Sequence, residues 1–125
     1  MIYIKINSTL YPASIEGKMS DKDWDGRESK AITMEADFDT VDALFPDGAV
    51  WSIVNEETVP VVDEEGNPIL DNESNPTYET KQTEFGNSEF SLRGDLTVHT
   101  NGTCTVKIGK LTELEEAYEI MLGGI

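Results

Sequence analysis

A segment near the start of the chain has side chains spaced to bind a metal ion. Asp21, Asp23 and Asp25 occupy alternate positions and Gly26 follows them, as in the first half of a calcium-binding loop. A hard cation prefers several carboxylates that converge on one point, and this spacing supplies three. The twelfth position of such a loop needs a bidentate Glu, but here it holds Ile32. We therefore expect calcium to bind weakly there, if at all, and we expect no other cofactor.

The same loop carries Trp24 and Arg27, which we single out as candidate contacts with a partner. A Trp that lies between aspartates has two interpretations: an exposed recognition residue, or a hydrophobic anchor that pins the loop. The second tryptophan, Trp51, lies within a predicted strand, which favours a position in the core.

Nucleophilic catalysis has little support in the sequence. His99 is the sole histidine and Cys104 the sole cysteine, and nothing marks a partner for either. Cys104 falls on the apolar face of a predicted strand, where a thiol is ordinarily inert packing. With 25 acidic residues in the chain, pairs of carboxylates arise by chance. We therefore expect a protein that is not an enzyme.

The composition bounds the class of protein. The chain has 125 residues, with 25 Asp and Glu against 9 Lys and Arg, for a formal net charge of -16. That length suits a single domain over residues 1–125. Direct binding to nucleic acid would need a cluster of basic residues, which the sequence lacks. No apolar run approaches the roughly 20 residues of a membrane span, and the start of the chain lacks the pattern of a signal peptide.

Alternating apolar and polar residues predict a series of β-strands. A short helix of at most about two turns, capped by Asp39 or Thr40 and ended by Pro46, is expected between two of them. Pro12 lacks a ladder donor, so its strand is expected at an edge or to begin there. The predicted strands are residues 2–6, 10–18, 30–38, 49–54, 58–62 and 78–85, followed by a hairpin over 90–108.

The hairpin has two candidate registers. A two-residue Asn101-Gly102 loop would place apolar side chains opposite polar ones. A three-residue loop that adds Thr100 keeps the apolar side chains on one face, with Gly102 in the left-handed conformation, and we choose it. The pairs expected from this loop are Val98 with Cys104, Leu96 with Val106 and Gly94 with Ile108.

The acidic residues concentrate in one part of the chain. Residues 56–95 hold 11 acidic and 2 basic side chains, and 11 minus 2 gives -9 of the net -16. Residues 63–70 and 71–78 are two copies of a short repeat, too few for a solenoid. We interpret them as consecutive polar turns at the tip of an acidic excursion over about residues 56–86.

A C-terminal helix is expected at about residues 113–122. Thr112 and Glu115 match a capping box, and Gly123 is the expected stop. The helix has one apolar stripe, which we expect to dock on the sheet, so that Leu114→Ala should cost about 2 to 5 kcal/mol. The alternative is that this stripe binds a partner. The stripe consists of Leu114, Ala117, Tyr118, Met121 and Leu122.

Together these patterns predict a mainly β domain, an antiparallel sandwich or an open barrel, with a short internal helix and one C-terminal α-helix.

Three segments carry a resemblance to a known group of proteins. Residues 23–33, 45–51 and 109–112 resemble small uncharacterised proteins of Firmicutes phages and prophages, and the similarity runs over most of the chain. The resemblance implies a phage-encoded protein from the structural gene region, associated with the tail or baseplate. It brings no catalytic residues to this chain.

Three functions remain open at this point. The first is a non-enzymatic structural or interaction module that contacts other protein subunits, such as those of a phage particle, and neither nucleic acid nor membrane. The second is an acidic DNA mimic that occupies a host nucleic-acid-binding protein, and the third is a calcium-dependent binding module. The lone cysteine suits a reducing compartment, so we expect the bacterial cytoplasm, with incorporation into a virion as a further possibility.

Overall fold

The structure is a computed structural model that describes residues 1–123, which form eight β-strands, two α-helices and one 3₁₀ turn. The strands within this range make two four-stranded antiparallel sheets, in the orders β2-β1-β5-β6 and β3-β4-β8-β7. The bounds are β1 Ile2–Ile6, β2 Thr9–Pro12, β3 Ser14–Asp21, η1 Lys22–Trp24, β4 Arg27–Met34, α1 Phe38–Leu44, β5 Ser52–Pro60, β6 Tyr78–Gly86, β7 Phe90–Val98, β8 Cys104–Lys110 and α2 Glu113–Gly123.

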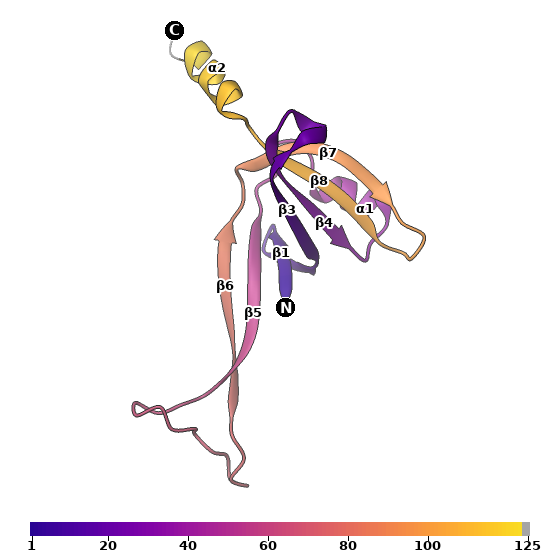
Figure 1. The fold of residues 1–125 in the computed structure, drawn as a ribbon. Helices are drawn as coiled ribbons and strands as arrows, with labels where there is room; N and C mark the ends of the chain where they lie inside the picture. Colours follow the sequence, from indigo (N-terminus) through magenta and orange to yellow (C-terminus); the bar gives the residue numbers. More distant parts are fainter. Residues whose placement is uncertain (124–125) are drawn as a thin grey trace.

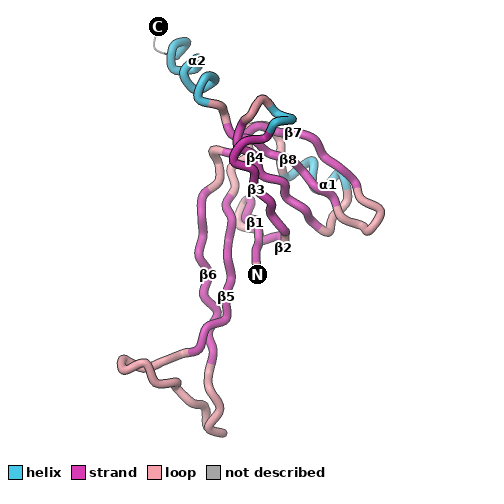
Figure 2. The backbone as a smooth tube through the Cα atoms, in the orientation of Figure 1, coloured by secondary structure: helices cyan, strands magenta, loops and turns pink. Residues whose placement is uncertain are grey.

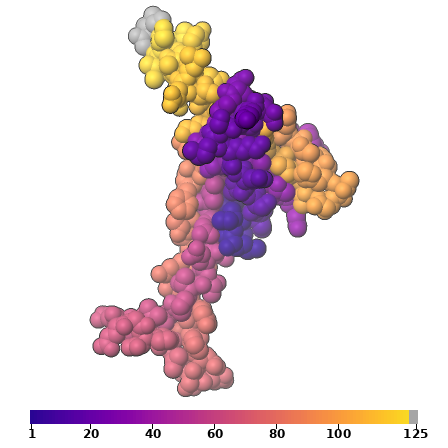
Figure 3. Space-filling view, in the orientation of Figure 1, coloured from indigo at the N-terminus to yellow at the C-terminus, as the bar shows by residue number. Residues whose placement is uncertain are grey.

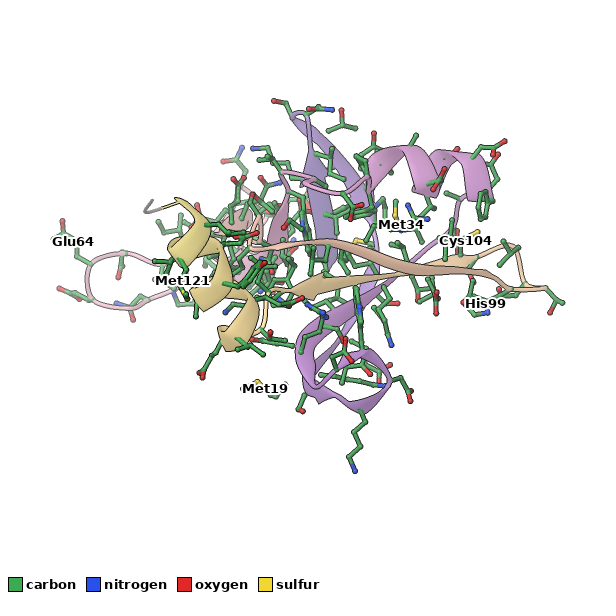
Figure 4. All side chains as sticks on the ribbon, turned by 90° about the horizontal axis from the view of Figure 1, so that it is seen from above. Met19, Met34, Glu64, His99, Cys104 and Met121 are labelled. Atoms are coloured by element: carbon green, nitrogen blue, oxygen red, sulfur yellow. The ribbon has the colours of Figure 1, made fainter. Side chains whose placement is uncertain are left out.

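The prediction of a mainly β chain with a short internal helix and a C-terminal helix is confirmed, and the two sheets are consistent with a sandwich. Trp51 lies in the core, as expected, with its ring 5.6 Å from that of Phe45 in an edge-to-face contact. Its indole N–H donates to the carbonyl of Phe90 at 3.0 Å. Cys104 is buried beside Met34, its cross-strand neighbour (Figure 4).

Several predicted strand bounds are wrong. Residues 10–18 do not form one strand, because the chain leaves the first sheet after Pro12 and enters the second at Ser14. The placement of Pro12 in an edge strand is confirmed. The strand predicted at 30–38 is β4, which ends at Met34, and the one predicted at 49–54 begins only at Ser52.

The short helix α1 follows β4 closely because of a capping carboxylate. Asp37, and not Asp39 or Thr40, is the N-cap, and its Oδ1 accepts from the backbone N–H of Thr40 at 2.8 Å. The helix therefore begins at Phe38, which the sequence pattern had placed in a strand. One helical turn brings Val41 into the core.

The hairpin of β7 and β8 has the predicted three-residue loop. Val98 pairs with Cys104 and Leu96 with Val106, and Gly102 has φ +85°. The third predicted pair is wrong: Ile108 faces Arg93 because the register shifts between Arg93 and Leu96. An irregularity of this kind bends a strand, and the period-2 pattern alone does not reveal it.

Two projections leave the sandwich at opposite ends (Figure 1). We call them the arm, residues 56–82, and α2. The space-filling view shows both as narrow extensions of a wider body (Figure 3). Neither helix within the described residues is long and apolar enough to cross a lipid bilayer.

Candidate interaction surfaces

The loop that carries Trp24 and Arg27 is anchored to the second sheet. A Cβ on Gly109 would lie 2.7 Å from Cζ3 of Trp24, and one on Gly94 would lie 3.0 Å from its Cη2, so the indole fits where two glycines leave room. The guanidinium carbon of Arg27 lies 5.0 Å from the centroid of the Trp24 ring. Of the two interpretations of Trp24, the half-buried ring agrees with an anchor that pins the loop.

Arg27 is 6% exposed, so it offers little surface to a partner. Its Nη1 and Nη2 instead donate to Oε1 and Oε2 of Glu115, at 2.6 and 3.2 Å, and Nη1 also donates to the carbonyl of Lys110 at 3.1 Å. A bidentate pair of this kind fixes the relative orientation of the two side chains as well as the distance between them. Arg27 therefore positions the start of α2.

Glu115 also closes the predicted capping box. Its Oε1 accepts from the backbone N–H of Thr112 at 2.9 Å, and the Thr112 hydroxyl accepts from the N–H of Glu115 at 3.2 Å. The Arg27 guanidinium, helped by this backbone bond, lowers the pKa of Glu115 to about 2. The Glu115 carboxylate thus begins the helix and ties it to the sheet. We call the contacts of Glu115 with Arg27 and Thr112 the latch.

The structure does not bring the three aspartates of the predicted calcium loop together. Asp21 is buried, and its Oδ2 bonds to Nζ of Lys107 at 2.6 Å and to Oγ of Ser29 at 2.9 Å. The Lys107 ammonium lowers the pKa of Asp21 to about 2 although burial opposes this. Asp23 and Asp25 are exposed. Among residues 1–123, no group of three or more His, Cys, Asp or Glu side chains is arranged to hold a metal ion.

The expected docking of the C-terminal helix on the sheet is wrong. The helix forms with the predicted cap, but its apolar stripe faces solvent. The latch and the short connector Leu111-Thr112 hold its first turn at the end of β8, and the helix continues away from both sheets (Figure 1). In the stripe the exposed fractions are 81% for Leu114, 64% for Tyr118, 69% for Met121 and 59% for Leu122, and Ile120, outside the stripe, is 74% exposed.

The arm is a long two-stranded ribbon. β5 and β6 pair continuously from Ser52 with Gly86 to Pro60 with Tyr78. Because β1 reaches only to Asn55, the outer half of β5 has β6 as its one neighbouring strand in the described part of the chain. β6 is exposed at every position. The segment expected as an excursion projects from the body as this ribbon, with longer strands than the sequence indicated.

The two repeats form two turns with the same hydrogen bonds. In each, Oδ1 of the first aspartate accepts from the backbone N–H groups two and four residues later, at 2.9 and 2.9 Å for Asp63 and at 2.9 and 3.0 Å for Asp71. Gly66 and Ser74 occupy equivalent left-handed positions, with φ +85° and +64°. The prediction of consecutive polar turns is confirmed (Figure 2).

A ring of three backbone hydrogen bonds closes the base of these turns at the outer end of the β5–β6 ribbon. The N–H of Ile69 donates to the carbonyl of Val61 at 2.9 Å, that of Thr77 to Ile69 at 3.0 Å, and that of Val61 to Thr77 at 2.9 Å. The two turns diverge from this ring (Figure 2), and Glu64 lies far out on one of them (Figure 4). The large apolar side chains exposed around the ring, which we call the tip cluster, are Val62, Ile69, Leu70 and Tyr78.

Sequence reasoning missed the partners that fix the loop and the helix. Arg27 and Glu115 are 88 residues apart, and Asp21 and Lys107 come from β3 and β8. The residue types indicated charge pairing, but no local pattern could select the partner.

Comparisons with known proteins gave no match: no family model, no curated protein and no solved structure is similar enough to this chain to count as one.

Proposed function

We propose that this protein is a non-enzymatic subunit of a larger protein assembly and that it binds neighbouring subunits through α2 and the arm. The observation that carries the proposal is the clustering of exposed large apolar side chains on both projections. Single apolar residues on a surface are normal, whereas clusters of them mark interaction sites. The body also exposes large apolar side chains, such as Met19, Val50 and Val98, but these come from separate segments of the chain, whereas the two projections each carry several together.

The arm has a second feature that suits assembly. A two-stranded ribbon is marginally stable alone, and an exposed edge strand presents unpaired backbone groups that can pair with another chain. β6 is such an edge, nine residues long. Its charged residues Glu79, Lys81 and Glu84 protect it from indiscriminate pairing. We infer that the ribbon becomes rigid when the arm lies against a neighbouring subunit.

The resemblance to Firmicutes phage and prophage proteins suggests the setting. We place the assembly in the tail or baseplate of a phage particle, with the chain in the bacterial cytoplasm before assembly and in the virion afterwards. A body with a narrow projection at each end suits a subunit that bridges neighbours.

The groups that could have served catalysis are occupied in other ways. Cys104 is 1% exposed and packs in the core. The ring of His99 bonds to the hydroxyl of Thr105 at 2.7 Å, and the buried Asp21 is paired with Lys107. These occupations support a non-enzymatic role.

A DNA mimic is the weaker alternative because the charge on the arm is sparse. Nine residues of strand span about 30 Å, a length over which duplex DNA carries about 18 charges. β5 and β6 together carry four acidic residues and one lysine. The acidic turns at the tip do not supply the regular stripe of negative charge that mimicry of DNA needs.

The test is to follow the chain in cells that produce it naturally, after induction of the prophage, by sedimentation of the particles. Wild-type protein should sediment with particles or with a complex much larger than its own 13.8 kDa. A variant in which an Asn-Gly turn replaces residues 61–77 keeps the body and loses the tip, and should be depleted from that fraction.

A matched variant, Glu64→Gln with Glu65→Gln, keeps the tip and removes two charges from one turn. It should stay in the particle fraction if the apolar tip cluster carries the contact. Wild-type protein that sediments only as the free chain would contradict the proposal.

A further inference from the structure

The stripe on α2 has the spacing of a helix that binds in a groove. Leu114, Tyr118, Met121 and Leu122 fall at positions i, i+4, i+7 and i+8, which lie on one face of a helix. A hollow of about 480 Å³ on this side of the helix is lined by Leu111, Leu114 and Tyr118, with Glu115 and Glu119. Helices recognised in apolar grooves use anchors at this spacing.

The charges beside the stripe are all negative. At 100° per residue, Glu113 and Glu119 fall on the two sides of the stripe and Glu116 falls opposite it. Residues 113–122 contain no Lys or Arg. Arg27 neutralises Glu115, so Glu113 and Glu119 remain to set the charge of the rim.

This charge pattern selects between two occupants of the stripe. A second copy of the chain would bring the same acidic rim and a net charge of -16, so its approach would be opposed by repulsion. A groove whose rim carries Lys or Arg would instead be complementary to Glu113 and Glu119. The occupant is therefore a different protein with a basic rim.

The latch makes the helix ready to bind. An isolated helix of eleven residues is marginal in water because its first turn is costly to form. In this chain the capping box and the bidentate contact with Arg27 hold that first turn. A helix that is already formed and oriented loses less conformational entropy when it binds.

We propose that α2 is a docking helix that inserts Leu114, Tyr118 and Met121 into an apolar groove, rimmed by Lys and Arg, on a different protein. This inference rests on the proposed function as an assembly subunit and names the kind of partner that one of its two projections takes. Arg27 and Glu115 act as positioning residues for the docking helix.

The test begins with a photoreactive benzoylphenylalanine placed at position 118, on the stripe, or at position 116, opposite the stripe. Both proteins are produced in the native cells and irradiated after prophage induction. Position 118 should crosslink to one protein many times more strongly than position 116. The crosslinked segment of that protein should combine apolar residues with nearby Lys or Arg.

The second step measures affinity for the purified crosslinked protein by calorimetry. Leu114→Ala should weaken binding by about tenfold or more, as loss of a central apolar anchor does. Alanine is the best helix former, so this change removes contact area and leaves the helix, which circular dichroism checks. Glu119→Gln should weaken binding several-fold at low salt and less at high salt, whereas Glu64→Gln, the same change at the arm tip, should not.

The role of the latch is tested by Glu115→Gln, which keeps a capping side chain but loses the charge that Arg27 grips. It should weaken binding while the helical content stays the same, and Glu116→Gln should leave the position of the helix unchanged.

Four results would overturn the inference: equal crosslinking from both positions, no crosslinking, crosslinking of position 118 to a second copy of the chain or to lipid, and an affinity insensitive to Leu114→Ala and to salt. The proposed function fails separately, when wild-type protein does not enter any assembly. If the chain assembles through its arm while the α2 variants bind normally, this inference fails and the proposed function stands.

Discussion

The body and α2 contain similar apolar residues in opposite environments. In the body, Trp51 and Phe45 are at most 1% exposed, and the indole N–H of Trp51 donates to the carbonyl of Phe90 at the start of β7. On α2, Leu114 and Tyr118 are more than half exposed. The same hydrophobic driving force therefore completes the body within the chain and leaves α2 to be completed by another molecule.

The arm resembles α2 in this respect but differs in its construction. Its strands are held by backbone pairing and its turns by Asp63 and Asp71, whereas α2 is attached through one side-chain pair at its base. A change in the body should consequently alter the stability of the whole domain, and a change on a projection should alter only binding.

The largest effect is expected at the centre of the body. Trp51→Ala should lower the free energy of unfolding by about 3 to 5 kcal/mol, because it leaves a cavity beside Phe45. Urea denaturation followed by circular dichroism measures this. Ile32→Val is a milder change at another fully buried site and should cost about 0.5 to 1.5 kcal/mol. A negligible loss of unfolding free energy in both variants would show that the core lies elsewhere.

A smaller effect is expected where the loop is anchored to the body. Gly109→Ala should cost about 1 to 3 kcal/mol, because its Cβ would lie 2.7 Å from both Trp24 and Arg27. Gly86→Ala is the matched control, since no atom lies within 4 Å of its Cβ position. In a background with Trp24→Ala the cost of Gly109→Ala should shrink. Equal stability of the two single variants would refute the close contact.

The buried carboxylate of Asp21 should make the stability of the protein depend on pH in acid. Asp21 has a pKa of about 2 in the folded chain against an ordinary 3.8, so its contribution to stability is present above about pH 4 and is lost between about pH 4 and pH 2. Asp21→Asn should therefore be less stable than wild type at neutral pH, and the two urea midpoints should converge through that window. If the urea midpoints of wild type and Asp21→Asn did not converge, this would contradict the ion pair of Asp21 with Lys107.

The smallest effect on stability is expected on α2. Leu114→Ala should change the free energy of unfolding by no more than about 0.5 kcal/mol, as for other surface substitutions. This reverses the 2 to 5 kcal/mol expected from the sequence, because the side chain is 81% exposed. A loss of 2 kcal/mol or more in the isolated protein would show that the helix packs on the sheet in solution, and the comparison of body and projection would fail there.

Much of the local structure could be predicted from the sequence because its causes lie within a few residues. The capping box needs only Thr112 and Glu115, and the loop of the last hairpin follows from Gly102 and the alternation around it. The two acidic turns follow from an aspartate four residues before an asparagine. Strand ends were less accurate, because Asp37 begins a helix inside an apparently continuous alternation.

The candidate site could be predicted only in part. The sequence singled out Trp24 and Arg27 as chemically unusual, but their roles as an anchor and a positioning residue depend on Gly109 and Glu115. Among the described residues the carboxylates of the predicted calcium loop form no metal site, and Asp21 is paired with Lys107 instead.

Strands, two polar turns and an amphipathic C-terminal helix could be predicted from the chain alone, because hydrogen bonds to nearby residues and the period of apolar side chains set these elements. The direction in which the apolar face of the helix points depends instead on contacts between distant segments. An amphipathic pattern states that a face is better covered than exposed, and it does not state what covers it. Here the pair of Arg27 with Glu115, formed between distant segments, directs the helix away from the sheets and leaves that face to a partner.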